Sequence, residues 1–411
     1  MSAILEADLQ SDGFKQNPFP ELERLRQVGP LFRTRVPFIG QIWMATTYEA
    51  VTELLRDHRR FVQNPATAGN RFVARLIRWL PRGLRPVASH MLLKDEPDHR
   101  RLRNLVNQAF QRQSIEGMRG RLTDLVDTAI DRMAAVPQVA VRGVDLVEHF
   151  AQPFPLAVIC ELLGLPDKDR PRFTRWASGV TSSRSVWGTA WGLLRLRKLV
   201  RYLQAQFREQ ARNPRPGLVA ALIEAEEAGD RLTEDELVAM VFLLLLAGHL
   251  TTVHLIAGGV LTLLDHPGQK AELLADWSLA DSAVNELLRF CSFVLVTKPR
   301  YAIEDTEFFG QRIRRGEILI ACLASANSDP ERFDRPEEFD IHRRPNPHVA
   351  FGTGIHVCLG ETLARAEAGI ALRQLFTRFP HLDLAVPRGE VEYTPRYGMR
   401  GLARLPVRLQ E

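Results

Sequence analysis

The chain has 411 residues, of which 45% are hydrophobic and 25% are charged, the composition of an ordinary globular protein. Its formal net charge of +5 favours acidic partners, but the arginines are spread along the chain rather than gathered in one run, which argues against nucleic-acid binding. Residues 1–14 are acidic and lack a basic segment followed by an apolar core. We therefore expect neither a signal peptide nor a membrane anchor.

The four cysteines, at positions 160, 291, 322 and 358, form no C-x-x-C pair. A zinc site or a dithiol redox motif is therefore not expected. A disulfide framework is equally unexpected in a chain this long, which fits a reducing compartment. The most apolar run, residues 241–247, is too short to span a bilayer. These features predict a cytoplasmic protein without a transmembrane anchor.

The first half of the chain alternates helical patterns with turn signals. Residues 42–46 favour a strand, and residues 48–56 favour a helix. From about residue 122 to residue 223 the pattern is nearly all helical. Prolines interrupt it at positions 153, 166 and 214.

The clearest helix is predicted to begin at Thr233. Thr233 and Glu236 form a capping-box pair, and an apolar stretch follows to about Leu264, before the stop signal Asp-His-Pro-Gly. A helix that is apolar on nearly all sides should cross the interior of a large domain. Strand signals come later, at residues 294–302, 313–320 and 402–408. The fold class is therefore mainly α with a smaller β portion, and no linker divides the chain, so we expect a single domain over residues 1–411.

A glycine-rich segment with one cysteine carries the strongest chemical signal. Residues 351–360 read Phe-Gly-Thr-Gly-Ile-His-Val-Cys-Leu-Gly. Glycines allow backbone conformations closed to other residues and a close approach to a flat ligand. A helix is predicted immediately after Cys358, and this position favours a thiolate, a good soft metal ligand. The stripe that this helix would bury consists of Leu359, Leu363, Ala366 and Ile370. The alternative is that Cys358 is a buried small hydrophobe, the usual fate of a lone cysteine.

The segment resembles the haem-binding loop of cytochromes P450, F-G-x-G-x-H-x-C-x-G. All six fixed positions match, a coincidence expected in roughly one such chain in ten thousand to a hundred thousand. The resemblance implies the P450 fold, with haem b between the long central helix and the cysteine loop. It also implies that Cys358 is the axial iron ligand, that His356 contacts a haem propionate and that Phe351 belongs to the haem site. A haem thiolate donates electron density that favours O–O cleavage.

Glu286 and Arg289 match the E-x-x-R pair of the same family. At a spacing of i,i+3 they share one helix face and can hydrogen-bond as a unit. Taken alone, such a pair would be an ordinary surface salt bridge. The resemblance implies instead that the pair is buried structure behind the haem and that Arg343 joins it.

Three further residues resemble haem-propionate contacts. His99 and Arg103 are four residues apart, so on a helix they point the same way, as two donors to one anion must. Arg300 resembles another propionate-binding arginine, with a spacing from Arg289 that is one residue longer than the family pattern.

Residues 247–252, Ala-Gly-His-Leu-Thr-Thr, resemble the oxygen-activation motif, in which small residues leave room above the iron and a threonine follows an acid. Ala247 and Gly248 fit, and Thr251 stands at the alcohol position, although a helical threonine can also simply bond back to the i−4 carbonyl. Leu250 occupies the position of the acid. A leucine cannot relay the protons that oxygen activation needs.

Thr251 with ordered water, a substrate hydroxyl or a distant carboxylate could replace the missing acid, and His249 is a weaker candidate. The favoured function is a monooxygenase that inserts one oxygen atom of O2 into a small, largely apolar substrate. Because Leu250 departs from the family pattern, a peroxide-driven or non-oxygenative haem-thiolate enzyme is the alternative function. A haem-binding protein without turnover is the third alternative.

The resemblance places substrate contacts at Leu243, Leu250, Phe293, Val294, Val296 and Tyr397, and also within residues 61–92 and 174–199. Arginines interleaved with aromatic residues recur in residues 71–85 and 184–201. Solvated basic faces are the favoured interpretation; the alternative is that they steer an anionic substrate, a carrier-protein-bound substrate or an anionic membrane. The family pattern takes up all 411 residues, which leaves no room for a flavin- or nicotinamide-binding domain. Electrons should therefore come from a separate acidic ferredoxin or flavodoxin that docks near Cys358.

Overall fold

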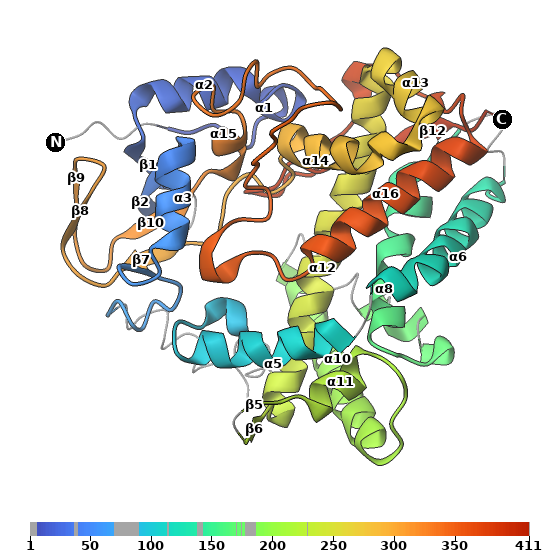
Figure 1. The fold of residues 1–411 in the computed structure, drawn as a ribbon, viewed down its shortest axis with the longest axis horizontal. Coiled ribbons are helices and arrows are strands. Elements are labelled where there is room, and N and C mark those ends of the chain that lie inside the picture. The colour runs from blue at the N-terminus through green and yellow to red at the C-terminus, as the bar shows by residue number, and fades with distance from the viewer. Residues whose placement is uncertain are drawn as a thin grey trace. The chain divides into compact units, whose positions relative to one another are not determined.

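The computed structural model describes residues 6–36, 40–69, 90–112, 115–137, 143–169, 171–173, 175–176, 186–227 and 229–410. The arginine-rich segment 71–85 lies outside these ranges, as do the side chains of residues 186–194. The chain forms two compact units (Figure 1). Unit 1 comprises residues 1–69, 126–153 and 251–411, and unit 2 comprises residues 70–125 and 154–250. Each unit is described by itself.

Unit 1 is built on a five-stranded sheet whose order is β1–β2–β10–β7–β3. Its strands are β1 (Leu31–Val36), β2 (Gly40–Ala45), β10 (Ile318–Ala321), β7 (Arg300–Ala302) and β3 (Phe61–Val62). β2 and β10 pair in parallel, with Leu319 opposite Trp43, and the other pairs are antiparallel. The strand predicted at residues 42–46 is confirmed as part of β2.

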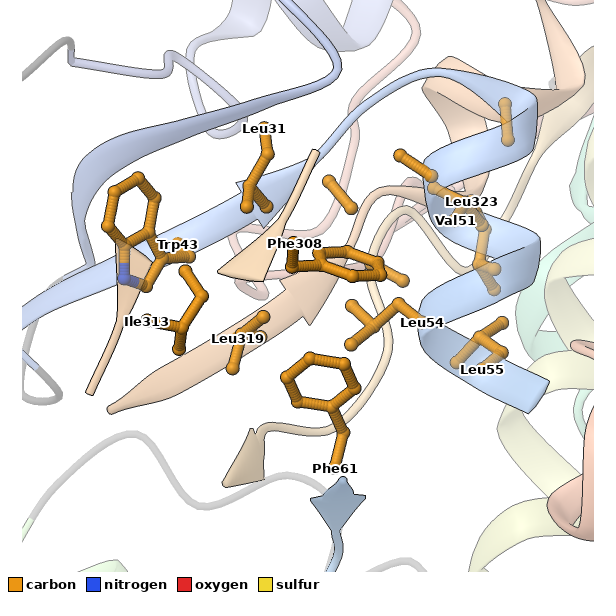
Figure 2. Packing of buried hydrophobic residues seen from close by; sticks show 14 of the residues in the cluster. Leu31, Trp43, Val51, Leu54, Leu55, Phe61, Phe308, Ile313, Leu319 and Leu323 are labelled. Carbon is orange, nitrogen blue, oxygen red and sulfur yellow. The ribbon is translucent and has the colours of Figure 1, made fainter. Parts of the chain in front are cut away.

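Helix α3 (Tyr48–Arg56) covers this sheet and has the bounds that the sequence predicts. The side chain of Thr47 caps it by accepting a hydrogen bond from the backbone N–H of Ala50. Figure 2 shows Leu54 of α3 pointing toward the rings of Phe308 and Phe61, and Leu55 belongs to the same buried cluster. Phe61 and Phe308 meet there edge to face, with ring centroids 5.0 Å apart. Burial of each such side chain stabilises the fold by about 1.5–3 kcal/mol.

Unit 1 contains further helices and short strands: α1 (Asp12–Gln16), α2 (Phe19–Val28), α13 (Pro267–Ala275), α14 (Ala280–Cys291), α15 (Leu323–Asn327), α16 (Glu361–Arg378), the hairpin β8–β9 (Thr306–Phe308, Gln311–Ile313) and the sheet β11–β12–β4 (Asp383–Leu384, Pro406–Arg408, Val144–Asp145). The predicted strand over residues 294–302 is shorter than expected, because Val294 and Val296 form only isolated bridges before β7. The other two late strand signals are likewise reduced to β10 and β12.

Unit 2 is helical, as the pattern from residue 122 onward predicts. It contains α5 (Asp98–Arg112), α8 (Pro153–Leu162), α10 (Val186–Arg212), α11 (Leu218–Glu224) and the short hairpin β5–β6 (Glu226–Glu227, Asp230–Arg231), while α6 (Ile115–Ala134) and α12 (Glu234–Asp265) continue into unit 1. Pro166 and Pro214 follow the ends of α8 and α10, whereas Pro153 begins α8 rather than breaking a helix.

The long helix α12 confirms the predicted capping box. The backbone N–H of Thr233 donates to Glu236 Oε2 at 2.9 Å, and the backbone N–H of Glu236 donates to Thr233 Oγ1 at 3.3 Å. By length and composition α12 could cross a membrane, but 67% of its most apolar window is buried. It is therefore a core helix.

Helix α16 differs from its prediction in two ways. It begins at Glu361 rather than directly after Cys358, because residues 354–356 form a 3-10 turn and Gly360 is the N-cap. Its buried face consists of Leu363, Glu367, Ala368, Ala371, Leu372, Leu375 and Phe376. Leu359, Ala366 and Ile370 of the predicted stripe are only half-buried. Contact with α14 selects the buried face, and that face includes a carboxyl that no apolar pattern could predict.

Candidate functional site

Cys358 differs from the other three cysteines in accessibility. Cys160, Cys291 and Cys322 are buried, whereas Cys358 is exposed. The loop that presents it closes on itself, because the backbone N–H of Cys358 donates to the carbonyl oxygen of Phe351 at 3.0 Å. Its sulfur can therefore reach a ligand from this loop. The alternative prediction, that Cys358 is a buried small hydrophobe, is wrong.

The two glycines of this loop adopt the left-handed conformations that were expected of them, with φ of +70° at Gly352 and +77° at Gly354. A Cβ built on Gly354 would lie 2.4 Å from the carbonyl oxygen of Leu55, near the end of α3. Beside it, Arg56 Nε donates to Thr353 Oγ1 at 3.4 Å. Close backbone contact with α3 thus fixes the position of the loop.

The donor set suits a haem iron better than a bare metal ion. No group of three or more His, Cys, Asp or Glu side chains able to hold a metal occurs among the residues that the structure describes. A structural zinc site needs about four protein ligands. Iron that four porphyrin nitrogens already hold needs only one axial thiolate from the protein. A single accessible cysteine is what such a group requires.

Aromatic and cationic side chains surround the start of the loop. The guanidinium of Arg365 lies 5.0 Å from the centroid of the Phe351 ring, within range of a cation–π interaction. The ring centroid of His348 lies 6.0 Å from that of Phe351. Burial, together with the charge of Arg365, lowers the pKa of His348 to about 4, so this ring is neutral at physiological pH. Phe351 and His356 are both half-buried.

The predicted Glu286–Arg289 pair is confirmed, and its burial is complete. Two N–H groups of Arg289 donate to the two carboxylate oxygens of Glu286 at 2.7 and 2.8 Å, and both side chains are 0% exposed. Arg343 Nε donates to Glu286 Oε1 at 3.1 Å, as expected.

Two asparagines that sequence reasoning missed complete this network. Asn346 Nδ2 donates to Glu286 Oε2 at 3.0 Å. Arg289 donates to the carbonyl oxygen of Asn327, and Asn327 Oδ1 accepts the backbone N–H of Val349 at 2.7 Å. The network thus extends from the ion pair to the residues just before the cysteine loop. Neither asparagine stands in a recognisable pattern, so no sequence signal could have identified them.

Arg300 is 1% exposed and ties two backbone segments of unit 1 together. It donates to the carbonyl oxygens of Phe61 at 3.0 Å and Leu55 at 3.3 Å. Leu55 is also the residue whose carbonyl contacts Gly354. The cysteine loop and this arginine therefore share one structural support.

In unit 2, His99 and Arg103 lie one turn apart on α5. His99 is buried, and burial followed by the positive charge of Arg103 lowers its pKa. The spacing of four residues places both on one face of α5. His99 Nδ1 lies 3.8 Å from Glu96 Oε1.

The middle of α12 carries the small residues of the oxygen-activation motif. Ala247 is exposed, and a Cβ built on Gly248 would lie 3.5 Å from Ile159 Cδ1. His249 is buried, and burial lowers its pKa to about 4. It is therefore a neutral imidazole at physiological pH rather than a store of protons. Leu250 and Thr251 are half-buried.

The residues expected to line a substrate pocket have different surroundings. A Cβ on Gly258 would lie 2.3 Å from Phe293 Cε1, so the Phe293 ring packs on α12 two turns beyond Thr251. There it lines a cleft of about 960 Å3 within unit 1, together with Phe19 and Phe290.

The other predicted pocket residues range from buried to half-buried. Val294 pairs with Met399, and Val296 pairs with Cys322. Leu243 is buried in unit 2. Burial raises the pKa of the half-buried Tyr397 to about 12, so its phenol is neutral at physiological pH.

Comparison with known proteins agrees with this chemistry. The family model described as Cytochrome P450 matches residues 195–395. The polyketide biosynthesis cytochrome P450 PksS of Bacillus subtilis (strain 168) is 36% identical and covers 97% of both chains. The cytochrome P450 monooxygenase PikC of Streptomyces venezuelae is 37% identical, over 98% of this chain and 94% of its own.

Solved structures of related proteins extend the comparison to the fold. The structure of the Bacillus subtilis PksS superposes with a TM-score of 0.88 at 35% identity, over 98% of this chain and 99% of that one. P450BioI, in complex with an acyl carrier protein ligated to hexadec-9Z-enoic acid, superposes with a TM-score of 0.83 at 34% identity, over 97% of this chain and 100% of that one. The two relatives and the two solved structures each match over 94% or more of both chains.

Proposed function

The chain belongs to the cytochrome P450 family of haem b-dependent monooxygenases, and we propose that it inserts one oxygen atom of O2 into a largely apolar substrate that it receives free or bound to a carrier protein. Both compact units would form one catalytic domain, since its relatives match it over nearly their full lengths. We infer a cytoplasmic location from the same relatives and from the buried character of α12.

The observation that carries the proposal is the accessible thiol of Cys358 on an ordered, glycine-supported loop. We assign Cys358 as the residue whose thiolate would bind the haem iron, and Phe351 and His356 as residues of the same loop that would contact the haem. Arg300, His99 and Arg103 would neutralise the propionates. Bound in this way, haem supplies the activation of dioxygen for insertion into a C–H bond.

Proton supply is the step in which this chain departs from the family pattern. Leu250 cannot exchange a proton, and the neutral His249 has no second proton to release near pH 7. We assign to Thr251 the role of holding and passing a proton through its hydroxyl, with a substrate hydroxyl or ordered water as its source. The small side chains at Ala247 and Gly248 would leave the room that this arrangement needs.

A second candidate function rests on Leu250 alone. An enzyme that uses peroxide, or one that rearranges its substrate without oxygen, has less need for an acid at this position. The two functions differ in one requirement, because only the monooxygenase consumes dioxygen and external electrons in step with product.

The electron donor and the substrate class that we propose follow from the charge of the chain and from its relatives. The net charge of +5 and the exposed Arg56, which contacts Thr353 of the cysteine loop, favour an acidic ferredoxin or flavodoxin as electron donor. One relative is a polyketide biosynthesis enzyme, and another was solved with a loaded acyl carrier protein. A carrier-bound acyl or polyketide chain is therefore the substrate class that we favour, and the apolar Leu243, Val294 and Val296 suit such a chain.

The spectrum of the reduced, carbon-monoxide-bound protein tests the ligand assignment. Wild type should show the red-shifted Soret band of a thiolate-ligated haem. Cys358→His should keep haem but lose the red shift, and Cys160→Ala, at a buried cysteine, should keep it. A well-folded wild type without the red shift would overturn the proposal. Turnover with dioxygen and a ferredoxin system, compared with turnover on peroxide alone, then separates the two candidate functions.

A further inference from the structure

Helix α10 in unit 2, whose place in the ribbon Figure 1 labels, carries a row of exposed cations. The side chains that it buries, in the part where side chains are described, are Leu199, Val200, Leu203, Phe207 and Gln210. Its exposed cations are Arg195, Arg197, Lys198, Arg201, Arg208 and Arg212. At about 100° per residue, those from Arg197 to Arg212 fall within an arc of about 100° opposite the buried side. They extend over roughly 22 Å of helix.

Among the residues that the structure describes, most of these charges have no ion-pair partner. Arg208 pairs with Glu234 at 3.0 Å. For Arg197, Lys198, Arg201 and Arg212, the described residues provide no ion pair. Arg197 and Arg201 lie at i,i+4, and Lys198 and Arg201 at i,i+3, spacings at which like charges repel. We call Arg197, Lys198, Arg201 and Arg212 the α10 basic face.

A neighbouring segment adds further positive charge along one flank. Tyr202 of α10 donates a hydrogen bond to Asp169 at 3.1 Å, and its ring centroid lies 5.5 Å from that of Trp176. These contacts hold Asp169 and Trp176, with the described residues between them (171–173 and 175), against α10. Arg172 and Arg175 of this segment are exposed, whereas Asp169 is buried and engaged by Tyr202. The segment therefore adds cations to the surface without adding an exposed carboxylate among its described residues.

The composition of this surface favours a protein over a membrane as its partner. A helix that binds a membrane surface combines cations with exposed large apolar side chains, which insert below the headgroups. In the part of the chain that the structure describes, Val28 and Leu246 are the large apolar residues with exposed side chains, and neither belongs to α10. The described cations of α10, beside which Glu209 is the helix's one carboxylate, suit a partner that presents carboxylates and phosphate.

We propose that the α10 basic face docks an acidic carrier protein that delivers the substrate as a thioester on its phosphopantetheine arm. The proposal rests on the proposed function, because it takes the carrier-bound substrate class from there and gives it a surface on this chain. The carboxylates of the carrier pair with Arg197, Lys198 and Arg201, and Arg212 extends the contact toward the end of the helix. Release of the like-charge repulsion along α10 contributes to binding.

A pair of charge-reversal variants tests this surface. Arg197→Glu/Arg201→Glu alters the α10 basic face, and Arg312→Glu/Arg314→Glu makes the same charge change at exposed arginines on and beside β9 in unit 1. The binding of a fluorescently labelled acyl carrier protein carrying a hexadec-9-enoyl thioester is measured on the haem-loaded enzyme by anisotropy. Free hexadec-9-enoic acid is titrated in parallel through the Soret shift.

Wild-type affinity for the carrier should fall as salt rises. Arg197→Glu/Arg201→Glu should weaken it at least tenfold, and the control variant less than twofold, while both bind the free acid like wild type. Equal carrier affinity in both variants, or no carrier binding by wild type, would overturn the docking proposal. A third outcome would also overturn it. Wild type would bind phosphatidylserine vesicles, and Arg197→Glu/Arg201→Glu would abolish that binding while leaving carrier binding unchanged. The thiolate spectrum and turnover of the free acid, measured on the same preparations, report separately on the proposed function.

Discussion

Gly354 lies so close to Leu55 that a Cβ on the glycine would stand 2.4 Å from the leucine's carbonyl oxygen. The same carbonyl oxygen accepts a hydrogen bond from Arg300. One backbone position of α3 therefore supports both the loop of Cys358 and an arginine assigned to a haem propionate. A shift of a few tenths of an ångström at Leu55 would therefore displace both the loop of Cys358 and the side chain of Arg300.

Gly354→Ala should consequently lower both stability and haem content. The variant meets a backbone clash and places an alanine at φ of +77°, where L-residues lose about 1–2 kcal/mol. Gly310→Ala is the matched control, because Gly310 has a similar φ of +70° but nothing within 4 Å of the built Cβ. Thermal unfolding and the haem-to-protein ratio measure the effect. Equal values for the two variants would contradict the close contact.

Glu286→Gln should destabilise the fold far more than a surface change of the same kind. The carboxylate accepts from Arg289, Arg343 and Asn346, and its loss leaves the buried guanidinium of Arg289 and the half-buried one of Arg343 without their counter-charge. Breaking a buried pair in this way costs about 3–5 kcal/mol.

Glu272→Gln provides the comparison, because Glu272 is exposed and pairs only with His342 among the described residues. Such pairs contribute about 0–1 kcal/mol. Urea unfolding of both variants gives the difference. A loss below about 1 kcal/mol for Glu286→Gln would show that the network rearranges.

Glu367 should make stability depend on pH. Its carboxyl is buried, no hydrogen-bond partner for Oε2 occurs in the described part of the chain, and burial raises its pKa well above the usual value. A raised folded-state pKa means that the folded form keeps a proton that the unfolded form loses above about pH 4.3. Stability therefore falls as pH rises from that point toward the folded-state pKa.

Glu367→Gln removes this dependence, so its stability relative to wild type should increase between pH 5 and pH 8. Glu337→Gln, at an exposed site, should follow the wild-type curve at every pH. Denaturant unfolding across this range measures both variants. Parallel curves for Glu367→Gln and wild type would indicate that the carboxylate ionises in the folded protein.

Leu250→Glu should raise the fraction of reducing equivalents that ends in product, because it restores an exchangeable proton one residue before Thr251. The control is His249→Gln. His249 is already neutral near pH 7, so its replacement should leave the pH profile of coupling between pH 6 and pH 8 unchanged. NAD(P)H consumption and product are measured together in a reconstituted ferredoxin system. A wild type that is already tightly coupled would show that the leucine imposes no limit.

Local signals in the sequence predict local structure well here. The helix from Tyr48 to Arg56 and the capping box of Thr233 and Glu236 depend on side chains within one turn of each other, and both are confirmed. The position of Glu286 and Arg289 in a buried pair also follows from a short motif.

Features that depend on distant partners could not be predicted. Asn327 joins the network because its segment packs beside α14, and its sequence surroundings give no sign of this. Glu367 points inward because α14 selects that face of α16, against the apolar pattern. The Phe293 ring packs on Gly258, a contact between residues 35 positions apart that no periodicity specifies.

The unequal accessibility of the four cysteines has a practical consequence. Cys160, Cys291 and Cys322 are shielded by packing, and burial raises the pKa of both Cys291 and Cys322 to about 11, which slows their reaction with alkylating reagents. Cys358 is the site that a maleimide or iodoacetamide should modify first. Iron coordination would mask it. A mass spectrum of the alkylated chain, taken during reconstitution, would therefore count loaded and unloaded molecules directly and follow haem insertion as the disappearance of a single label.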